Sequence, residues 1–452
     1  MKYYICIMIL LMVSCKKEYS YNEGDKDDLI EMTFKSYSSS TRTSLQSDNS
    51  VFWDSGDEIS ILANSWGMKN YRFTTHDSGS YATFTGKAIW ENIYYGLYPY
   101  KTLDDVYLED NIITTSLPNI QSATTNSFDK KANIAVAKSD ENRNMFFYNA
   151  CALLKFDINI PNNDKITSVK FCSNNTSVKL SGDIRIEITD SLPNVSISDG
   201  HNYVILESND GFKSGIEYYM VVSPAVLSRG FTLYFMCDDI IIGYKDTQKN
   251  AILKQGTILD LGTINYISKP AVPVDLGLSV RWASCNIGAN SVEDFGNYYA
   301  WGEVAPKSEY TIDNYLYKED DDVFLYLGDN ISGSDYDVAR KEWGNYWRIP
   351  TKGDCEELEG KCTFEWITFK GVYGKKVTGP NGNSIFLPAC GFCKDSELYE
   401  SNVYGYYWLG NSSESDINSK YAYDLYFYED RISWRSMSGR YYGYSIRPVT
   451  YY

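Results

Sequence analysis

The chain has 452 residues and a formal net charge of −17, with 43% hydrophobic and 22% charged residues. This composition excludes a wholly disordered chain and a protein with many membrane-spanning helices, and the length suggests about two to four domains. The acidic balance argues against nucleic acid as a partner, because proteins that bind phosphate backbones gather Lys and Arg on one face. The two histidines, His76 and His201, leave little of the residue most used in acid–base and metal chemistry. We therefore expect no enzymatic activity, no cofactor and no metal.

The first residues have the layout of an export signal. Lys2 precedes an apolar run over residues 5–13, which is about half of the roughly 20 residues that a membrane-spanning helix needs. The run closes with Met12-Val13-Ser14-Cys15, which resembles a bacterial lipobox. In that signal residues 1–14 are removed, and the cysteine becomes an N-terminus that carries acyl chains such as palmitate. An ordinary secretory signal is the alternative, and either signal exports the chain.

A lipidated Cys15 would hold the exported protein at a membrane. Each methylene placed in the bilayer contributes about 0.8 kcal/mol, so several chains on one residue form a stable anchor. Residues 15–28 are polar and charged without apolar periodicity, which predicts a flexible tether. We expect a lipid-anchored protein of the outer membrane, exposed at the cell surface or part of a fimbrium.

Strand patterns dominate the sequence from residue 29 to residue 266. Apolar residues alternate or run for strand lengths, and turn formers such as DSG, PNND and SDG separate the runs. Many short strands with regular turns favour β-sandwiches, and the length allows two of them, at 29–155 and 156–266. The clearest strand patterns lie at 57–64, 81–89, 92–100, 152–160, 179–188, 202–208, 216–224 and 230–239.

The pattern changes after the second predicted sandwich. Two prolines within residues 267–273 predict a stiff linker, because proline fixes φ and lacks a backbone donor. Residues 274–452 are rich in Gly, Trp and Tyr and are predicted to form an α+β domain. Two short helices are expected there, with N-terminal capping at Ser334 and Thr351 and C-terminal glycines at Gly344 and Gly360.

Motifs in the first half resemble the fimbrillin family of surface lipoproteins. These are SSSTRTSL at 38–45, VFWDSGDEISIL at 51–62 and GTILDLGTINY at 256–266, in that order behind the lipobox. The resemblance implies two transthyretin-like β-sandwiches that assemble into pili by strand exchange. In some members a protease cuts after an arginine near the first strand, and Arg42 is the matching residue here. A solvated arginine without a special role is the alternative.

Strand exchange makes other pilus subunits the expected partners, since an open sheet edge is stabilised by an incoming strand. A shaft subunit would end near its own donor strand, whereas this chain continues into a further domain. That domain would obstruct onward polymerisation, so we expect a pilus tip or pilus-associated adhesin. The alternative is a stand-alone glycan-binding lipoprotein that captures nutrients, with the sandwiches as spacers.

Six ordered blocks in the last third resemble the Fibrobacter-type major paralogous domain. Its fold is related to C-type lectins and to formylglycine-generating enzymes, so the resemblance implies a C-type-lectin-like domain over 274–452. The blocks are VDLGLSVRWASCNIGA (274–289), FGNYYAWGEV (295–304), WGNYWRIPT (343–351), VTGPNGNSIFLPACGF (377–392), YGYYWLGN (404–411) and YGYSIRPV (442–449).

The activities of these relatives do not carry over. No nucleophile–base pair can be assembled from the sequence, and the cysteines lack the enzymes' arrangement. The EPN, QPD and WND triplets of calcium-dependent lectins are absent. The acidic run Glu319–Asp322 offers oxygen ligands for Ca²⁺, but an acidic loop without a full ligand pattern is simply solvated.

Binding of an extracellular glycan or protein is the remaining interpretation. Glycan sites combine flat aromatic faces with amides and carboxylates that read hydroxyl groups. Other aromatic and basic residues in the six blocks are expected to be structural, namely Trp282, Trp301, Trp343, Trp347, Trp408 and Arg447. The predicted ligand-binding residues are Tyr406, Asp424, Trp434, Arg435, Tyr441 and Tyr442.

Eight of the ten cysteines remain when Cys6 and Cys15 are set aside, three before residue 265 and five after it. An oxidising compartment permits disulfides. The odd numbers leave a free thiol in each half unless a bridge joins the halves, and the sequence does not decide the pairing. Cys390 and Cys393 form a CxxC without a second such pair, so we expect neither zinc nor redox chemistry from them.

Overall fold

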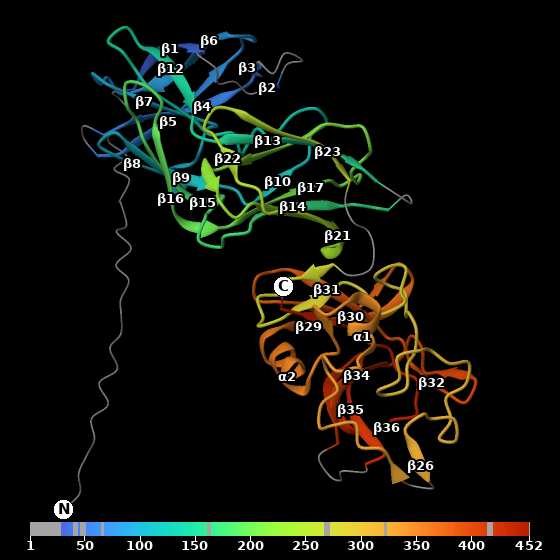
Figure 1. The fold of residues 1–452 in the computed structure, drawn as a ribbon. Helices are drawn as coiled ribbons and strands as arrows, with labels where there is room; N and C mark the ends of the chain where they lie inside the picture. Colours follow the sequence, from blue (N-terminus) through green and yellow to red (C-terminus); the bar gives the residue numbers. More distant parts are fainter. Residues whose placement is uncertain are drawn as a thin grey trace, which may run out of the picture.

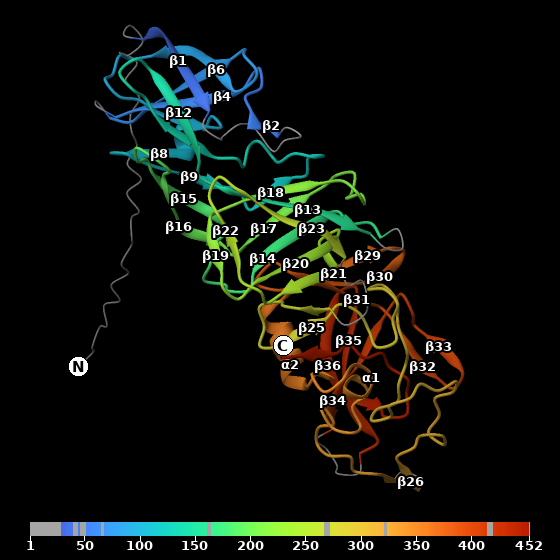
Figure 2. The same cartoon turned by 45° about the horizontal axis from the view of Figure 1, so that its top comes forward.

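The computed structural model describes residues 29–38, 44–45, 51–64, 67–160, 164–265, 272–320, 323–413 and 419–451. The predicted signal, the tether, Cys15 and Arg42 therefore lie outside the described residues. Figures 1 and 2 show three bodies in a row, which we call the barrel, the sandwich and the terminal module. The described chain is mostly β, as predicted, and its two α-helices lie in the terminal module.

The barrel is a closed sheet at the N-terminal end of the described chain. Its first strand runs parallel to one neighbour and antiparallel to the other, so that it fills the gap between them. Alternation along this strand turns Met32, Phe34 and Ser36 inward, each at most 3% exposed. In order around the barrel the strands are β1 (Ile30–Ser38), β12 (Asn144–Asn149), β11 (Ala135–Lys138), β7 (Tyr95–Tyr98), β4 (Glu58–Ala63), β5 (Lys69–Thr75) and β6 (Tyr81–Ala88). A short hairpin, β2 (Ser44–Leu45) and β3 (Val51–Phe52), and the 3-10 turn η2 (Leu103–Asp105) complete this part.

Three strands that follow the barrel strand β7 in sequence pair outside the barrel. They are β8 (Val106–Glu109), β9 (Ile112–Leu117) and β10 (Ile120–Ser122). Strand β9 pairs with β8 and with β15, and β10 pairs with β17. Strands β15 and β17 lie far along the chain. The strands β9 and β10 within residues 112–122 thus pair with strands beyond residue 156. A shared hydrophobic core joins the barrel to this sheet and contains Leu62, Leu97, Ile113, Ile184 and Val221.

The sandwich packs two sheets face to face. Its core between them is apolar and rich in aromatic residues, with Leu154, Phe171, Leu206 and Leu233 all fully buried. One sheet has the order β18 (Tyr218–Val222), β13 (Ala152–Asn159) and β23 (Ile258–Asn265). The other contains β10, β17 (Tyr203–Glu207), β14 (Ser168–Ser173), β20 (Phe231–Cys237) and β21 (Ile240–Thr247). The flanking strands are β15 (Ser181–Glu187), β16 (Asn194–His201), β19 (Ala225–Leu227) and β22 (Ala251–Leu253).

The larger sheet of the sandwich continues into the terminal module. Strand β31 (Ser384–Pro388) lies parallel to β21, paired at Ile240 and Ser384, and β30 (Val372–Thr378) and β29 (Thr363–Phe369) follow it. The eight strands form one sheet. The cores also interlock, because Phe386 packs into the sandwich core while Met236 packs into the core of the terminal module.

The end of the predicted proline linker is part of the terminal module. Val272 is 1% exposed, and β24 (Pro273–Val274) pairs with β25 (Arg281–Ala283). The remaining elements of the module are β26 (Lys318–Asp320), β27 (Val323–Phe324), α1 (Val338–Trp343), β28 (Trp347–Arg348), α2 (Lys352–Lys361), β32 (Phe392–Lys394), β33 (Glu397–Tyr399), β34 (Gly405–Ser412), β35 (Tyr421–Tyr428), β36 (Arg431–Gly439) and β37 (Val449–Thr450).

The N-terminal cap was predicted correctly for one helix. Thr351 caps α2 and forms a reciprocal capping box with Asp354. For α1 the prediction of Ser334 was wrong, because the cap is Asp337, whose carboxylate accepts hydrogen bonds from the first turn. Ser334 instead donates its hydroxyl to the carbonyl of Ile331, three residues back.

The C-terminal prediction was also correct for one helix only. Gly344 ends α1 with a φ of 94°, a left-handed conformation that glycine adopts without strain. Gly360 lies inside α2, which continues to Lys361 and ends at Cys362. Glycine therefore marked the end of a helix only at Gly344, where the backbone has a positive φ.

Five of the six aromatic and basic residues predicted to be structural are buried, and Trp343 is half-buried against the core of the terminal module. Trp282, Trp301 and Trp408 are at most 1% exposed. Arg447 is fully buried and donates to the carbonyls of Ala283 and Phe386 at 3.1 and 2.8 Å. Arg447 is therefore structural, as predicted, and its guanidinium is held by main-chain carbonyls.

Candidate ligand-binding surface

The predicted ligand-binding residues Tyr406 and Trp434 lie on opposite faces of the sheet β34–β35–β36, and Tyr441 and Tyr442 follow its last strand. Side chains alternate between the faces along a strand. Tyr406 and Tyr426 face one core of the terminal module, whereas Leu425 and Trp434 face the other. Tyr406 and Trp434 therefore cannot contribute to one continuous surface.

Asp424 and Arg435 pair across strands β35 and β36. Asp424 is fully buried and accepts a hydrogen bond of 2.8 Å from the hydroxyl of Ser438, which itself accepts one from Tyr444. We expected Asp424 to contact a ligand, but it supports the sheet from inside. The side chain of Arg435 lies outside the described part of the structure.

Tyrosine and phenylalanine rings form a continuous surface beside the hairpin β32–β33, which we call the tyrosine face. Tyr404 and Tyr426 stack with an interplanar angle of 14° and ring centroids 5.6 Å apart. Tyr426 and Tyr428 follow at 5.8 Å, and Phe392 stacks on Tyr399 at 5.5 Å. The face comprises Phe392, Tyr399, Tyr404, Tyr406, Tyr426, Tyr428 and Tyr442.

The rings of the tyrosine face differ in exposure. Tyr406 is 8% exposed and forms its floor, whereas Tyr404, Tyr426 and Tyr428 are half-buried and reach solvent. Tyr441 is also half-buried and packs on Tyr442 with centroids 4.7 Å apart. The sequence identified Tyr406 and Tyr442 but missed the outer rings. Their signal was the alternation YAYDLYFY, which places Tyr426 and Tyr428 on one face of a strand.

Carboxylates border the tyrosine face. The hydroxyl of Tyr406 donates to Glu400 at 2.5 Å, and that of Tyr399 donates to Glu397 at 2.9 Å. The hydrogen bond to Glu397 raises the pKa of Tyr399, since the bond favours the protonated phenol. Both carboxylates are exposed and retain lone pairs for further donors. The border is therefore rich in hydrogen-bond acceptors and negatively charged.

Trp434 belongs to a second, smaller surface. Its ring is half-buried, with the ring centroid of Tyr423 5.6 Å away. The ammonium of Lys352 lies 4.4 Å from the centroid of the Trp434 ring, a cation–π distance. One face of the indole is thus covered by a cation, which reduces the flat area that it can offer to a ligand.

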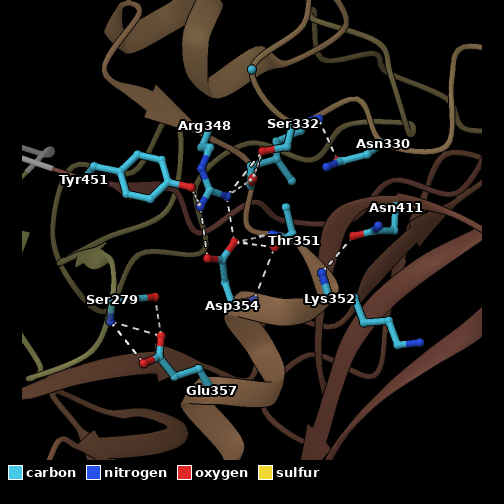
Figure 3. Close-up of polar contacts among 12 residues, drawn as sticks. Ser279, Asn330, Ser332, Arg348, Thr351, Lys352, Asp354, Glu357, Asn411 and Tyr451 are labelled. Atoms are coloured by element: carbon cyan, nitrogen blue, oxygen red, sulfur yellow. Dashed lines mark hydrogen bonds and ion pairs between the residues drawn. The ribbon is translucent and has the colours of Figure 1, made fainter.

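The start of helix α2 is held by a polar network (Figure 3). Both guanidinium nitrogens of Arg348 contact the carboxylate of Asp354, at 2.6 and 3.0 Å, and the Thr351 hydroxyl donates to it at 2.7 Å. Burial opposes the charge on Asp354, but the hydrogen bonds from Arg348 and Thr351 outweigh it and lower the pKa of that carboxyl. The main-chain nitrogen of Lys352 donates to Asn411, which fixes α2 against β34.

We expect Asp354→Asn to destabilise the start of α2 by about 2 kcal/mol at neutral pH, because it leaves the half-buried Arg348 without its carboxylate partner. Because the pKa of Asp354 is lower in the folded state, the stabilisation that its carboxylate provides is fully present above the unfolded pKa of about 3.9. This stabilisation is lost as the pH falls through the folded pKa. Hydrogen exchange of the α2 amides, followed from pH 7 downward, measures the effect. Exposed Asp335→Asn is the control, and equal exchange in Asp354→Asn and the wild type at pH 7 would contradict the prediction.

The described cysteines are all free thiols. Burial raises the pKa of Cys151 and of Cys172 to about 12, so these thiols stay protonated and poorly reactive. In the described ranges no group of three or more His, Cys, Asp or Glu is placed to hold a metal ion. No helix in the same ranges is long and apolar enough to cross a membrane.

Solved structures resemble the chain only distantly. A candidate cell adhesion protein from Bacteroides uniformis matches with a TM-score of 0.33 and 14% identity, over 52% of this chain and 93% of its own. A fimbrial protein from Bacteroides ovatus matches with a TM-score of 0.27 and 10% identity, over 93% and 100%. The C-terminally truncated tip fimbrial protein Mfa3 from Porphyromonas gingivalis matches with a TM-score of 0.22 and 8% identity, over 48% of this chain and 81% of its own. These TM-scores are too low to establish a shared fold or function. No family model and no curated protein matches the chain.

Proposed function

We propose that the protein is a non-catalytic cell-surface adhesion protein whose terminal module binds neutral glycans through the tyrosine face. The observation that carries this proposal is the run of half-buried rings over Tyr404, Tyr426 and Tyr428 beside exposed carboxylates. The transthyretin-like character of the β-bodies, the lectin-like character of the terminal module and the lipid anchor at Cys15 are parts of the same proposal.

The chemistry of the tyrosine face suits a sugar. The C–H groups on one side of a pyranose ring form a flat apolar surface that packs on aromatic rings, and its hydroxyls donate to acceptors at the rim. Glu397 and Glu400 supply such acceptors. Their negative charge repels uronic and sialic acids, so the proposal names uncharged sugars.

The position of the terminal module supports a role in contact. It lies at the opposite end of the molecule from the barrel, which begins the described chain (Figure 1). An anchor that precedes the barrel would therefore hold the terminal module away from the membrane. The shared sheet and the interlocking cores together join it to the sandwich.

Tyr426→Ala is expected to weaken binding to immobilised uncharged oligosaccharides about tenfold, or about 1.4 kcal/mol, because it removes the central ring of the face. Binding is measured on a panel that includes acidic oligosaccharides, which are expected not to bind. Tyr107→Ala, an exposed tyrosine of β8, is the matched control. Loss of binding in Trp434→Ala with normal binding in Tyr426→Ala would place the ligand on the other surface and contradict the proposal.

Assembly into a pilus is the second element of the proposal. Strand β1 pairs with β6 and β12 on its two sides, so its removal would expose two sheet edges and the pockets of Met32 and Phe34. Such an opening accepts a strand from a neighbouring subunit. A cut after Arg42 would release this strand, because β1 ends at Ser38.

N-terminal sequencing of the protein from its native membrane tests this second element. Maturation by cleavage predicts a chain that begins at Thr43 and co-purifies with polymeric subunits, and Arg42→Ala is expected to block both. A chain that begins at Cys15, is monomeric and is retained on polysaccharide would contradict assembly and favour nutrient capture. Glycan binding by the tyrosine face would stand in either case, since the two tests use different parts of the molecule.

A further inference from the structure

One lysine is buried at the junction between the sandwich and the terminal module. Lys170 lies on β14 and is 3% exposed, and its side chain points away from the sandwich core toward the module. Its ammonium nitrogen Nζ lies 2.7 Å from Oδ1 of Asn383, which is 5% exposed and directly precedes β31. The two residues are 213 positions apart in the sequence. They meet because β21 and β31 share one sheet.

Lys170 has few polar contacts. Its amine nitrogen contacts one acceptor oxygen, Asn383 Oδ1, and the ring of Tyr203, whose centroid is 3.8 Å away. No carboxylate forms an ion pair with Lys170 among the described residues. Burial lowers the pKa of Lys170, which makes the neutral, nucleophilic form of the amine easier to reach.

Asn383 is held in place for a reaction with this amine. Its amide nitrogen Nδ2 donates to the main-chain carbonyl of Asp275 at 2.7 Å, so the carboxamide cannot rotate freely.

We propose that Lys170 and Asn383 form an amide cross-link between the sandwich and the terminal module. The nitrogen Nζ of Lys170 attacks the carbon Cγ of Asn383, and a new C–N bond forms. The old bond from Cγ to Nδ2 breaks, and Nδ2 leaves as ammonia after it receives the proton that Nζ loses. The reaction needs no oxidant, reductant or other reactant.

The cross-link would serve a protein that transmits force. Strand β31 pairs with β21 at a single position, so hydrogen bonds alone join the two parts of the sheet weakly. A covalent bond from β14 to the residue before β31 bypasses that position. Load applied to the terminal module would then reach the sandwich through a bond that does not open.

The test is the intact mass of the purified full-length chain, followed by peptide mapping. The wild type is expected to be lighter than its sequence by one ammonia, and a proteolytic digest should contain a branched peptide that joins the segments of Lys170 and Asn383. Lys170→Met and Asn383→Ala should each have the full mass of their sequences. Lys376→Met is the matched control, because Lys376 also reaches across the junction, to Asp239 at 3.1 Å, but has no amide partner there.

A wild-type chain with the full mass of its sequence overturns the proposal, whatever the variants do. A lighter chain whose branched peptide joins other residues also overturns it. The wild-type measurement needs no variant to fold.

Discussion

The fold depends on the sheet that passes from the sandwich into the terminal module. Strands β21 and β31 pair side by side although they are far apart in sequence, and the cores on both sides exchange residues such as Phe386 and Met236. Burial of these side chains is favourable only while the two parts stay together, at roughly 1.5–3 kcal/mol for each large apolar side chain. The terminal module is thus mounted on the sandwich, and its orientation does not depend on the proline segment alone.

The candidate binding surface follows from strand alternation inside that mounted module. On β35 the even-numbered tyrosines 426 and 428 reach the face beside hairpin β32–β33, while Leu425 and Phe427 fill the core on the other side. The same strand therefore supplies both packing and a surface. The hydrogen bond from the main-chain nitrogen of Lys352 to Asn411 fixes helix α2 against strand β34 of this sheet.

Local chemistry was readable from the sequence, and long-range pairing was not. The Thr351–Asp354 capping box is a short-range pattern, and the burial of Trp408 and Arg447 followed from the motifs around them. The division of Tyr406 and Trp434 between two faces depends on the pairing of three strands, which no local pattern states. The meeting of Lys170 with Asn383 depends on a parallel pairing of distant strands in the same way. Local sequence patterns predict one aromatic site because they do not contain the register in which the strands pair.

Native-state hydrogen exchange of the full-length chain tests the coupling of sandwich and terminal module most directly. The free energies of opening for amides of β20 and β21 are compared with those of β30 and β31. The account predicts that both groups open together with one common free energy, as one cooperative unit. Exchange of the β30 and β31 amides while those of β20 and β21 stay protected would contradict it, because the terminal module would then open independently of the sandwich.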